Sequence, residues 1–182
     1  MIAKVMTGDL LALIEELNLD SIQNAANGIG PMGRGIAGAI KRAGGNEIQA
    51  DAFRVCNDVD PQPGDAYSTI TGKLKSKGIK RIIHAVTMKQ PGGPTSYEII
   101  RMAFESALAL AKKENIKHIG CTALGTATGG LDPVKVADIM LDIASKITGI
   151  DVSFVDIDDR FIKRIKDYVL HLDGVYLDDI DD

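Results

Sequence analysis

Residues 24–45, NAANGIGPMGRGIAGAIKRAGG, constrain the fold more than any other part of the sequence. They include two asparagines and seven glycines, and glycine loses more conformational freedom on folding than any other residue. The run SIQNAA, which leads into the glycines, predicts a short buried strand, and Ile36, Ile40 and Ala43 lie at helical spacing. The stretch therefore predicts a strand, a glycine loop and a helix that ends at a pair of glycines.

Strand-like and helix-like patterns alternate along the rest of the chain. Strands are predicted at residues 2–6, 20–27, 66–71, 81–87, 118–124 and 152–157, and helices at 10–17, 35–43, 46–56, 100–111, 136–147 and 161–169. This alternation predicts an α/β fold, a three-layer α/β/α sandwich with a mixed, largely parallel central sheet. We expect residues 1–172 to form one domain and residues 173–182, DGVYLDDIDD, to form an acidic tail.

Overall charge and apolar segments argue against several classes of protein. A net charge of −4 with no evident basic face argues against a protein that coats nucleic acid, although GKLKSKGIK at 72–80 predicts a basic turn. No apolar stretch approaches the roughly 20 residues of a membrane span, and the N-terminus lacks a signal-peptide pattern. A cytoplasmic protein with no membrane partner is therefore expected.

The two cysteines and three histidines predict neither a metal site nor a disulfide framework. Cys121 lies in the apolar run IGCTAL, which favours a buried structural thiol. His84 lies within the strand pattern IIHAV, where a hydrogen-bonded core histidine is the common case. No metal and no cofactor are predicted.

Two glycine-rich loops follow two of the predicted strands. NGIGPMGRG follows SIQNAA, GTATGG follows HIGCTAL, and each loop leads into a helix. In a parallel sheet, ligands bind at the loops after the strands, and backbone N–H groups exposed by glycine bind anionic oxygens. Two such loops together suit a diphosphate, whereas either loop alone is better explained as a tight turn. The spacing of Gly28, Gly30 and Gly33 does not complete a dinucleotide-binding fingerprint, because the acidic residue expected about 20 positions later falls in a helix.

The chain resembles the macro domain family in the order of its motifs. These are GDL, NAAN, a glycine loop opening a helix that ends RAGG, IIHAV and ALGTATGGLD, and together they span Gly8 to Ile157. The resemblance implies binding of ADP-ribose. The family includes readers of ADP-ribose, phosphatases of ADP-ribose 1″-phosphate and hydrolases that remove ADP-ribose from proteins or nucleic acids.

The resemblance also implies roles for individual residues. Asp9 would accept a hydrogen bond from the adenine amino group, the Leu10 amide would meet the ring, and Asn27 would bind the distal ribose. Asp9 is explained equally well as an N-cap of the helix predicted at 10–17. Ile157 would replace the aromatic residue that often stacks on adenine. The remaining ligand-binding positions are the phosphate loops, with Gly33, Arg34, Gly35 and Ile36 in the first and Gly125, Thr126, Ala127, Thr128, Gly129 and Gly130 in the second. Arg34 is equally well explained as a solvent-facing loop arginine.

Departures from the family pattern bear on catalysis. Ala37 stands where one branch of hydrolases has an aspartate, and the second loop has no aromatic residue. PMGRGIA, TMKQPGGPTSYE and LGTATGGLD are instead similar to the branch of a terminal ADP-ribose glycohydrolase and of antitoxins that strip ADP-ribose from DNA. That branch uses an aspartate, which Asp132 matches, and a lysine, which Lys89 matches only if the loop shifts by one residue from Met88.

Structural explanations compete with these two catalytic roles. A lysine in a Pro/Gly loop is more often solvated than nucleophilic, and Asp132 before a proline is typical of a helix N-cap. We favour the N-cap for Asp132 and keep a catalytic role for it as the lesser alternative.

Three functional hypotheses remain from the sequence. The first is an ADP-ribose-binding domain that hydrolyses ADP-ribose 1″-phosphate or an ADP-ribosylated conjugate, with Asn27, Lys89 and Asp132 as candidate catalytic residues. The second is a reader that binds ADP-ribose without chemistry, which Ala37 and the mismatch at Lys89 favour. The third is a nucleotide-binding α/β domain that keeps only the architecture. Nucleic acid is expected only as an ADP-ribosylated substrate, and the sequence leaves the substrate and the oligomeric state open.

Overall fold

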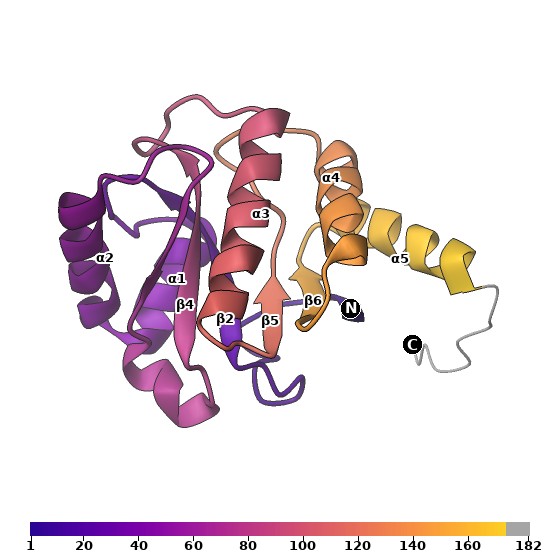
Figure 1. The fold of residues 1–182 in the computed structure, drawn as a ribbon, viewed down its shortest axis with the longest axis horizontal. Helices are drawn as coiled ribbons and strands as arrows, with labels where there is room; N and C mark the ends of the chain where they lie inside the picture. The colour runs from indigo at the N-terminus through magenta and orange to yellow at the C-terminus, as the bar shows by residue number, and fades with distance from the viewer. Residues whose placement is uncertain (174–182) are drawn as a thin grey trace.

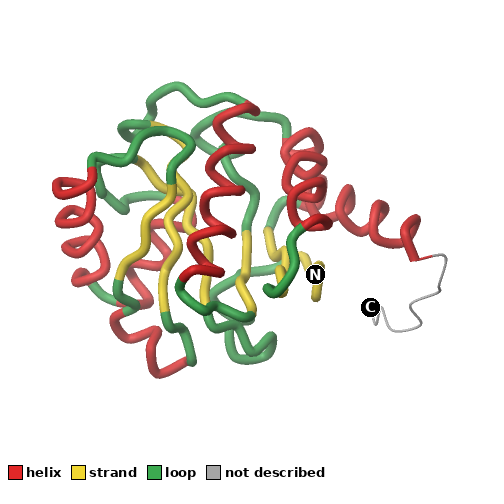
Figure 2. The backbone as a smooth tube through the Cα atoms, in the orientation of Figure 1, coloured by secondary structure: helices red, strands yellow, loops and turns green. Residues whose placement is uncertain are grey.

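A six-stranded sheet runs through the chain, of which the computed structural model describes residues 1–173, and helices cover both faces (Figures 1 and 2). In chain order the elements are β1 (Ile2–Thr7), β2 (Ser21–Asn27), α1 (Gly35–Gly44), α2 (Asn46–Val59), β3 (Ala66–Thr69), the 3₁₀ helix η1 (Gly72–Lys77), β4 (Arg81–Met88), α3 (Tyr97–Lys113), β5 (His118–Cys121), α4 (Pro133–Lys146), β6 (Asp151–Asp156) and α5 (Asp159–Asp173). The predicted three-layer α/β/α sandwich is confirmed.

The strand order is β1-β6-β5-β2-β4-β3, with only β3 antiparallel to its neighbour β4. From β2 the sheet continues to β4 toward one edge, and from β5 it continues to β6 toward the other edge. The direction in which successive strands are added therefore reverses between β2 and β5. Those two strands pair only where Ser21 and Ile22 meet Ile119 and Gly120. Beyond that point they separate toward their carboxyl ends, which is where ligands bind in open α/β sheets.

Apolar side chains fill both sides of the sheet. On one side, α3, α4 and α5 bury Phe104 and Phe161, and Phe154 of β6 packs between them with ring centroids 6.3 and 6.0 Å away. On the other side, α1 and α2 bury Ile40 and Ile48 against β2 and β4. Figure 1 shows α3 and α4 in front of the sheet and α1 behind it.

Two predicted segments differ in the structure. Residues 10–18 form consecutive turns rather than the predicted helix, because short-range hydrogen bonds such as Ala12 N to Asp9 O begin the segment and Asn18 has a left-handed backbone (φ 50°). Its apolar periodicity serves packing instead, since Leu10, Ile14 and Leu17 are buried. The predicted basic turn at 72–80 contains the helix η1.

Further boundaries of the prediction also change. Strand β5 ends at Cys121 rather than at residue 124, so the loop that follows is longer than the sequence predicted.

No helix within residues 1–173 is both long and apolar enough to cross a membrane. Residues 174–182 of the predicted acidic tail lie outside the described part of the chain.

His84 is a hydrogen-bonded core histidine, as the sequence predicted. Its Nδ1 lies 2.9 Å from Asn24 Nδ2, and its Nε2 lies 2.8 Å from Thr69 Oγ1. The ring also stacks on Tyr67, with centroids 4.5 Å apart. Complete burial lowers the pKa of His84 from 6.5 to about 3, so the ring is neutral at physiological pH.

Gly120 in β5 gives room to two leucines, Leu10 at the start of the turn segment and Leu19 just after its end. A Cβ added at Gly120 would lie 2.6 Å from Cδ1 of both Leu10 and Leu19. We expect Gly120→Ala to lower the free energy of unfolding in urea by about 1–3 kcal/mol, because both buried leucines must shift. Gly33→Ala is the matched control, since no protein atom lies within 4 Å of its added Cβ, and it should change stability by less than ~0.5 kcal/mol. Equal effects would contradict this packing.

The buried neutral His84 predicts loss of stability in acid. The unfolded chain binds a proton near pH 6.5 and the folded chain only near pH 3, so the stability present above pH 6.5 is lost as pH falls through that interval. The His84 contribution to the slope is at most ~1.4 kcal/mol per pH unit. His84→Gln should remove that part of the slope in urea titrations between pH 6.5 and 5, and parallel curves would refute it.

Candidate functional site

The loops that follow the parallel strands meet at one edge of the sheet, at the top of Figure 1. The first loop (residues 28–34) touches the loop after β4, because Gly28 N donates to the carbonyls of both Met88 and Lys89 at 3.0 Å. The second loop (residues 122–131) touches the same β4–α3 loop, since a Cβ added at Gly129 would lie 2.7 Å from the methyl group of Thr95. Each glycine loop therefore contacts the β4–α3 loop, the first at its start and the second near its end.

Asn27 holds the first loop in shape. Its Oδ1 accepts hydrogen bonds from the N–H groups of Ile29 (3.1 Å) and Gly30 (2.8 Å), and its Nδ2 donates to Pro31 O at 2.9 Å. The side chain is only 9% exposed. Asn27 is thus a bracing residue for the loop, and one N–H of its amide remains for a ligand.

The first loop opens α1 with its backbone uncovered. Met32 anchors the loop, because its side chain is buried and its N–H donates to Gln49 Oε1 of α2 at 2.8 Å. In contrast, a Cβ added at Gly33 or at Gly35 would have no protein atom within 4 Å. Gly35 has φ +55°, and Arg34 precedes α1 without a side-chain cap. The first N–H groups of α1, which include that of Ile36, therefore lack a capping side chain.

Arg34 lies in this loop, and Arg42, which the sequence did not single out, lies near it. Arg34 is exposed within the loop. Arg42 begins one turn after Gly38 on α1, and its Nη1 lies 3.2 Å from the position of a Cβ on Gly38. Gly33 O lies 2.9 Å from that same position, so the Arg42 guanidinium reaches the loop. The missing side chain at Gly38 was the only sequence feature that could have indicated this.

Internal hydrogen bonds close the second loop, and residues in its middle are exposed to solvent. Leu131 N donates to Gly125 O at 3.1 Å, and Gly130 N donates to Ala127 O at 3.2 Å. Gly129 packs so closely that an added Cβ would lie 2.5 Å from Gly125 O. Ala127 is exposed, and so are its neighbours Thr128 and Gly130, whereas Thr126 is half-buried.

Asp9 and Ile157 follow the carboxyl ends of β1 and β6, at the same end of the sheet as the glycine loops. Gly8 N donates to Asp156 O at 3.0 Å, which places the end of β1 beside the end of β6. Asp9 Oδ1 accepts from Leu11 N at 2.9 Å, so Asp9 caps a turn rather than the predicted helix. Leu10 is buried, but Ile157 is 81% exposed and offers an apolar surface.

An irregularity in β4 brings Lys89 to the first loop. The register of β2 against β4 skips Thr87, so Asn27 pairs with Met88. This one-residue bulge lies at the carboxyl end of β4. The Lys89 Cδ then lies 3.2 Å from a Cβ position on Gly28, and its Nζ pairs with Asp60 and donates to Pro61 O at 3.2 Å. Bulges are common next to active sites.

Asp132 is the N-cap of α4, as we favoured from the sequence. Its Oδ1 accepts from Val134 N at 2.9 Å, Pro133 follows at the first helical position, and its own N–H donates to Tyr97 Oη at 3.2 Å. The side chain is exposed, so a second carboxylate oxygen stays open. Ala37 is buried in α1 and supplies no group to the site.

Several buried polar atoms without a hydrogen-bond partner lie in β2 and in the loops after β4 and β5. Of five such side-chain atoms in the described residues, four lie in β2, just after β5 or in the β4–α3 loop: Gln23 Oε1, Asn24 Oδ1, Thr122 Oγ1 and Thr95 Oγ1. Gln23 Nε2 spans the separation by donating to Thr122 O at 3.2 Å. Unpaired buried polar atoms are rare in folded proteins, so this region is unusually rich in unused hydrogen-bonding capacity.

Comparison with known proteins agrees with this geometry. The chain is 40% identical to an uncharacterised protein of Aquifex aeolicus over 154 residues, covering 82% of this chain and 89% of the relative. It is 32% identical to an O-acetyl-ADP-ribose deacetylase of Salmonella gallinarum, covering 78% of this chain and 76% of the relative.

Solved structures share the fold. The macrodomain of Mycobacterium tuberculosis DarG superposes with a TM-score of 0.71 at 25% identity, over 84% of this chain and 98% of that one. An Oceanobacillus iheyensis macrodomain, a mutant with ADP-ribose, superposes with a TM-score of 0.76 at 23% identity, over 93% of this chain and 92% of that one. The sequence profile of the macro domain matches residues 23–140. This match includes nearly all of β2, both glycine loops and the bulged end of β4, and the chain therefore belongs to the macro domain family.

Proposed function

We propose that this protein binds ADP-ribose at the carboxyl edge of its sheet and hydrolyses a bond at the distal ribose of an ADP-ribose derivative. One observation carries the proposal. The two glycine loops follow β2 and β5, which separate after Ile22, and Gly33, Gly35 and Gly130 have no protein atom within 4 Å of an added Cβ. The uncovered backbone between them suits the two phosphates of a nucleoside diphosphate.

Side chains around the loops favour ADP-ribose over a simple anion as the ligand. Arg34 and Arg42 place two cations at the first loop, where a diphosphate carries its charge. Asp9 keeps one carboxylate oxygen that the turn does not use, and this oxygen suits an adenine amino group. Ile157 gives the ring an apolar neighbour at the same edge.

The catalytic part of the proposal assigns three residues to the distal ribose. Asn27 orients the ribose through its remaining amide N–H, and Lys89 and Asp132 supply charge on either side. The Lys89–Asp60 pair does not prevent this, because both side chains are partly exposed, at 39% and 77%, and such pairs contribute little free energy. Rate enhancement would come from positioning and electrostatics. The related Salmonella protein is named for hydrolysis of an ADP-ribose ester, which supports this class of reaction.

A reader of ADP-ribose without chemistry is the second candidate, and the contacts of the same three residues favour it. Asn27 braces its own loop, Lys89 pairs with Asp60, and Asp132 caps α4. Each residue therefore has a structural reason to be present. Ala37 is buried and offers no carboxylate in their place.

Titration calorimetry with ADP-ribose tests binding. Gly33→Val adds a side chain over the first loop in space that no protein atom occupies. We expect the wild type to bind, and this variant to bind at least tenfold more weakly with an unchanged urea midpoint. Lys73→Ala on η1, at the opposite edge of the sheet, is the control and should bind like the wild type. Absence of binding to the wild type at millimolar ADP-ribose would overturn the proposal.

Turnover by matched variants separates enzyme from reader. Asp132→Asn keeps the N-cap, since asparagine caps as well as aspartate, and removes the charge. Lys89→Met removes the ammonium group, and Lys163→Met is its control, because Lys163 also forms an exposed pair with an aspartate. We expect Asp132→Asn and Lys89→Met to lower turnover of ADP-ribose 1″-phosphate or an ADP-ribosylated conjugate at least tenfold, and Lys163→Met to leave it unchanged.

The outcomes of that assay are distinct. If the wild type turns over neither these substrates nor O-acetyl-ADP-ribose while it binds ADP-ribose, the protein is a reader. If turnover is present and neither Asp132→Asn nor Lys89→Met reduces it, the catalytic assignment is wrong.

A further inference from the structure

A cluster of cations lies at the edge of the sheet opposite the glycine loops. Residues 72–81, GKLKSKGIKR, contain four lysines, one arginine and no acidic residue, in a chain of net charge −4. The structure exposes all five of these side chains, which are Lys73, Lys75, Lys77, Lys80 and Arg81. We call residues 70–81 the basic pole.

The backbone of the basic pole is firmly built. Leu74 and Ile79 are each 1% exposed and anchor η1 and the start of β4 in the core. Gly72 has φ +52°, and an added Cβ would collide with Gly44 O at the end of α1. Gly78, with φ +94°, ends η1. The lysines are therefore displayed on a fixed turn rather than on a loose loop.

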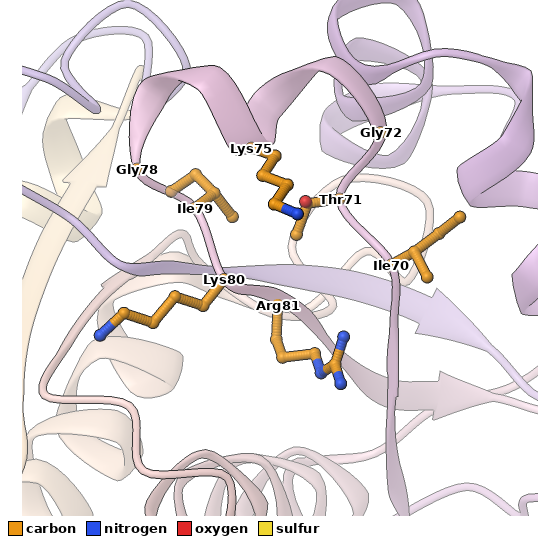
Figure 3. A pocket seen from close by; sticks show the side chains of 8 residues that line it. All are labelled: Ile70, Thr71, Gly72, Lys75, Gly78, Ile79, Lys80 and Arg81. Carbon is orange, nitrogen blue, oxygen red and sulfur yellow. The ribbon is translucent and has the colours of Figure 1, made fainter.

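A hollow of about 490 Å³ lies within the basic pole (Figure 3). Lys75 enters it from η1, and Lys80 and Arg81 line it from the start of β4. Thr71 adds a hydroxyl group, and Ile70, which is 43% exposed, adds an apolar wall. The lining thus combines cations, a hydrogen-bonding group and an apolar surface.

Four carboxylates lie near the basic pole, and two of them pair with its cations. Asp51 Oδ2 accepts from Ile70 N at 2.9 Å, and Glu47 Oε1 lies 3.1 Å from a Cβ position on Gly72. Asp20 pairs with Lys80 at 2.9 Å, but it also accepts from the backbone N–H groups of residues 117 and 118. Glu114 lies 3.2 Å from Arg81 Nε and also accepts from Ser68 Oγ. The terminal nitrogens of the Arg81 guanidinium remain for another acceptor.

The three lysines of η1 lack such partners. Within residues 1–173, Lys73, Lys75 and Lys77 have no carboxylate within 4.0 Å. Unpaired lysines close in sequence repel one another, and an anionic ligand would relieve that repulsion.

We propose that the basic pole binds the phosphodiester backbone of a nucleic-acid strand. Ammonium and guanidinium groups are the usual partners of backbone phosphates. Five cations spread over ten residues match a row of phosphates better than one small anion, and Ile70 offers an apolar contact for a sugar or base. Overall charge had argued against nucleic acid, but these cations are close together in the sequence and the fold exposes all of them.

This site is separate from the glycine loops. Arg81 and Met88 are the two ends of β4, and a strand of that length spans about 23 Å at ~3.3 Å per residue. The nucleotides held at the basic pole would therefore leave the ADP-ribose site open. The inference does not rest on the proposed function, and either can fail alone.

Fluorescence anisotropy with a labelled 20-nucleotide single-stranded DNA and the matching RNA tests the inference on the full chain. The triple variant Lys73→Glu, Lys75→Glu, Lys77→Glu should lose at least tenfold in affinity at 50 mM salt. The control triple Lys4→Glu, Lys163→Glu, Lys166→Glu has the same net charge and should stay within threefold of the wild type. Raising salt from 50 to 200 mM should weaken wild-type binding about 20-fold if three phosphates are neutralised.

Several results would overturn the inference. These are no binding of either oligonucleotide at 50 mM salt, equal losses in the two triple variants, or displacement of the oligonucleotide by saturating ADP-ribose, which would place it in the glycine loops. Two further probes separate other ligands. Binding of inorganic phosphate without the oligonucleotide would indicate a small-anion site, and binding only to vesicles with 20% phosphatidylserine would indicate a membrane surface.

Discussion

The parallel pairing of β2 with β4 is the constraint on which the candidate site depends. Asn24 and His84 hydrogen-bond across this pair at 2.9 Å, and the register then skips Thr87. The skip sets Asn27 against Met88 and leaves Lys89 beside the first loop. On its other side β2 leaves β5 after Ile22. The first loop therefore starts from a fixed strand end at the place where the sheet opens.

Backbone and side chains have different roles at the carboxyl ends of these strands. The glycine loops supply N–H groups and open space, whereas the polar side chains around them hold the backbone in place. Asn27 closes the first loop, Gln49 fixes it to α2, and Asp132 starts α4 after the second loop. Because these contacts form within the protein, ligand binding would require little reordering, and preorganised sites lose less free energy on binding.

Much of this structure could be predicted from the sequence, since local patterns report on local structure. The alternation of apolar runs and glycine turns predicted the layers, and apolar neighbours predicted the buried state of His84. The segment 10–18 was predicted wrongly because the spacing of Leu10, Ile14 and Leu17 serves packing in the core without a continuous helix. Lys89 and Arg42 depend on a strand bulge and on the absent side chain of Gly38, which are tertiary features that periodicity does not encode.

Backbone amide shifts in an NMR titration with ADP-ribose can show whether both glycine loops bind the ligand, because they report on each loop separately. The account predicts the largest changes at residues 28–36 and 125–131, smaller changes beside Asp9 and Ile157, and none at the basic pole. Changes confined to residues 70–81, or the absence of changes in both glycine loops at saturating ligand, would contradict it.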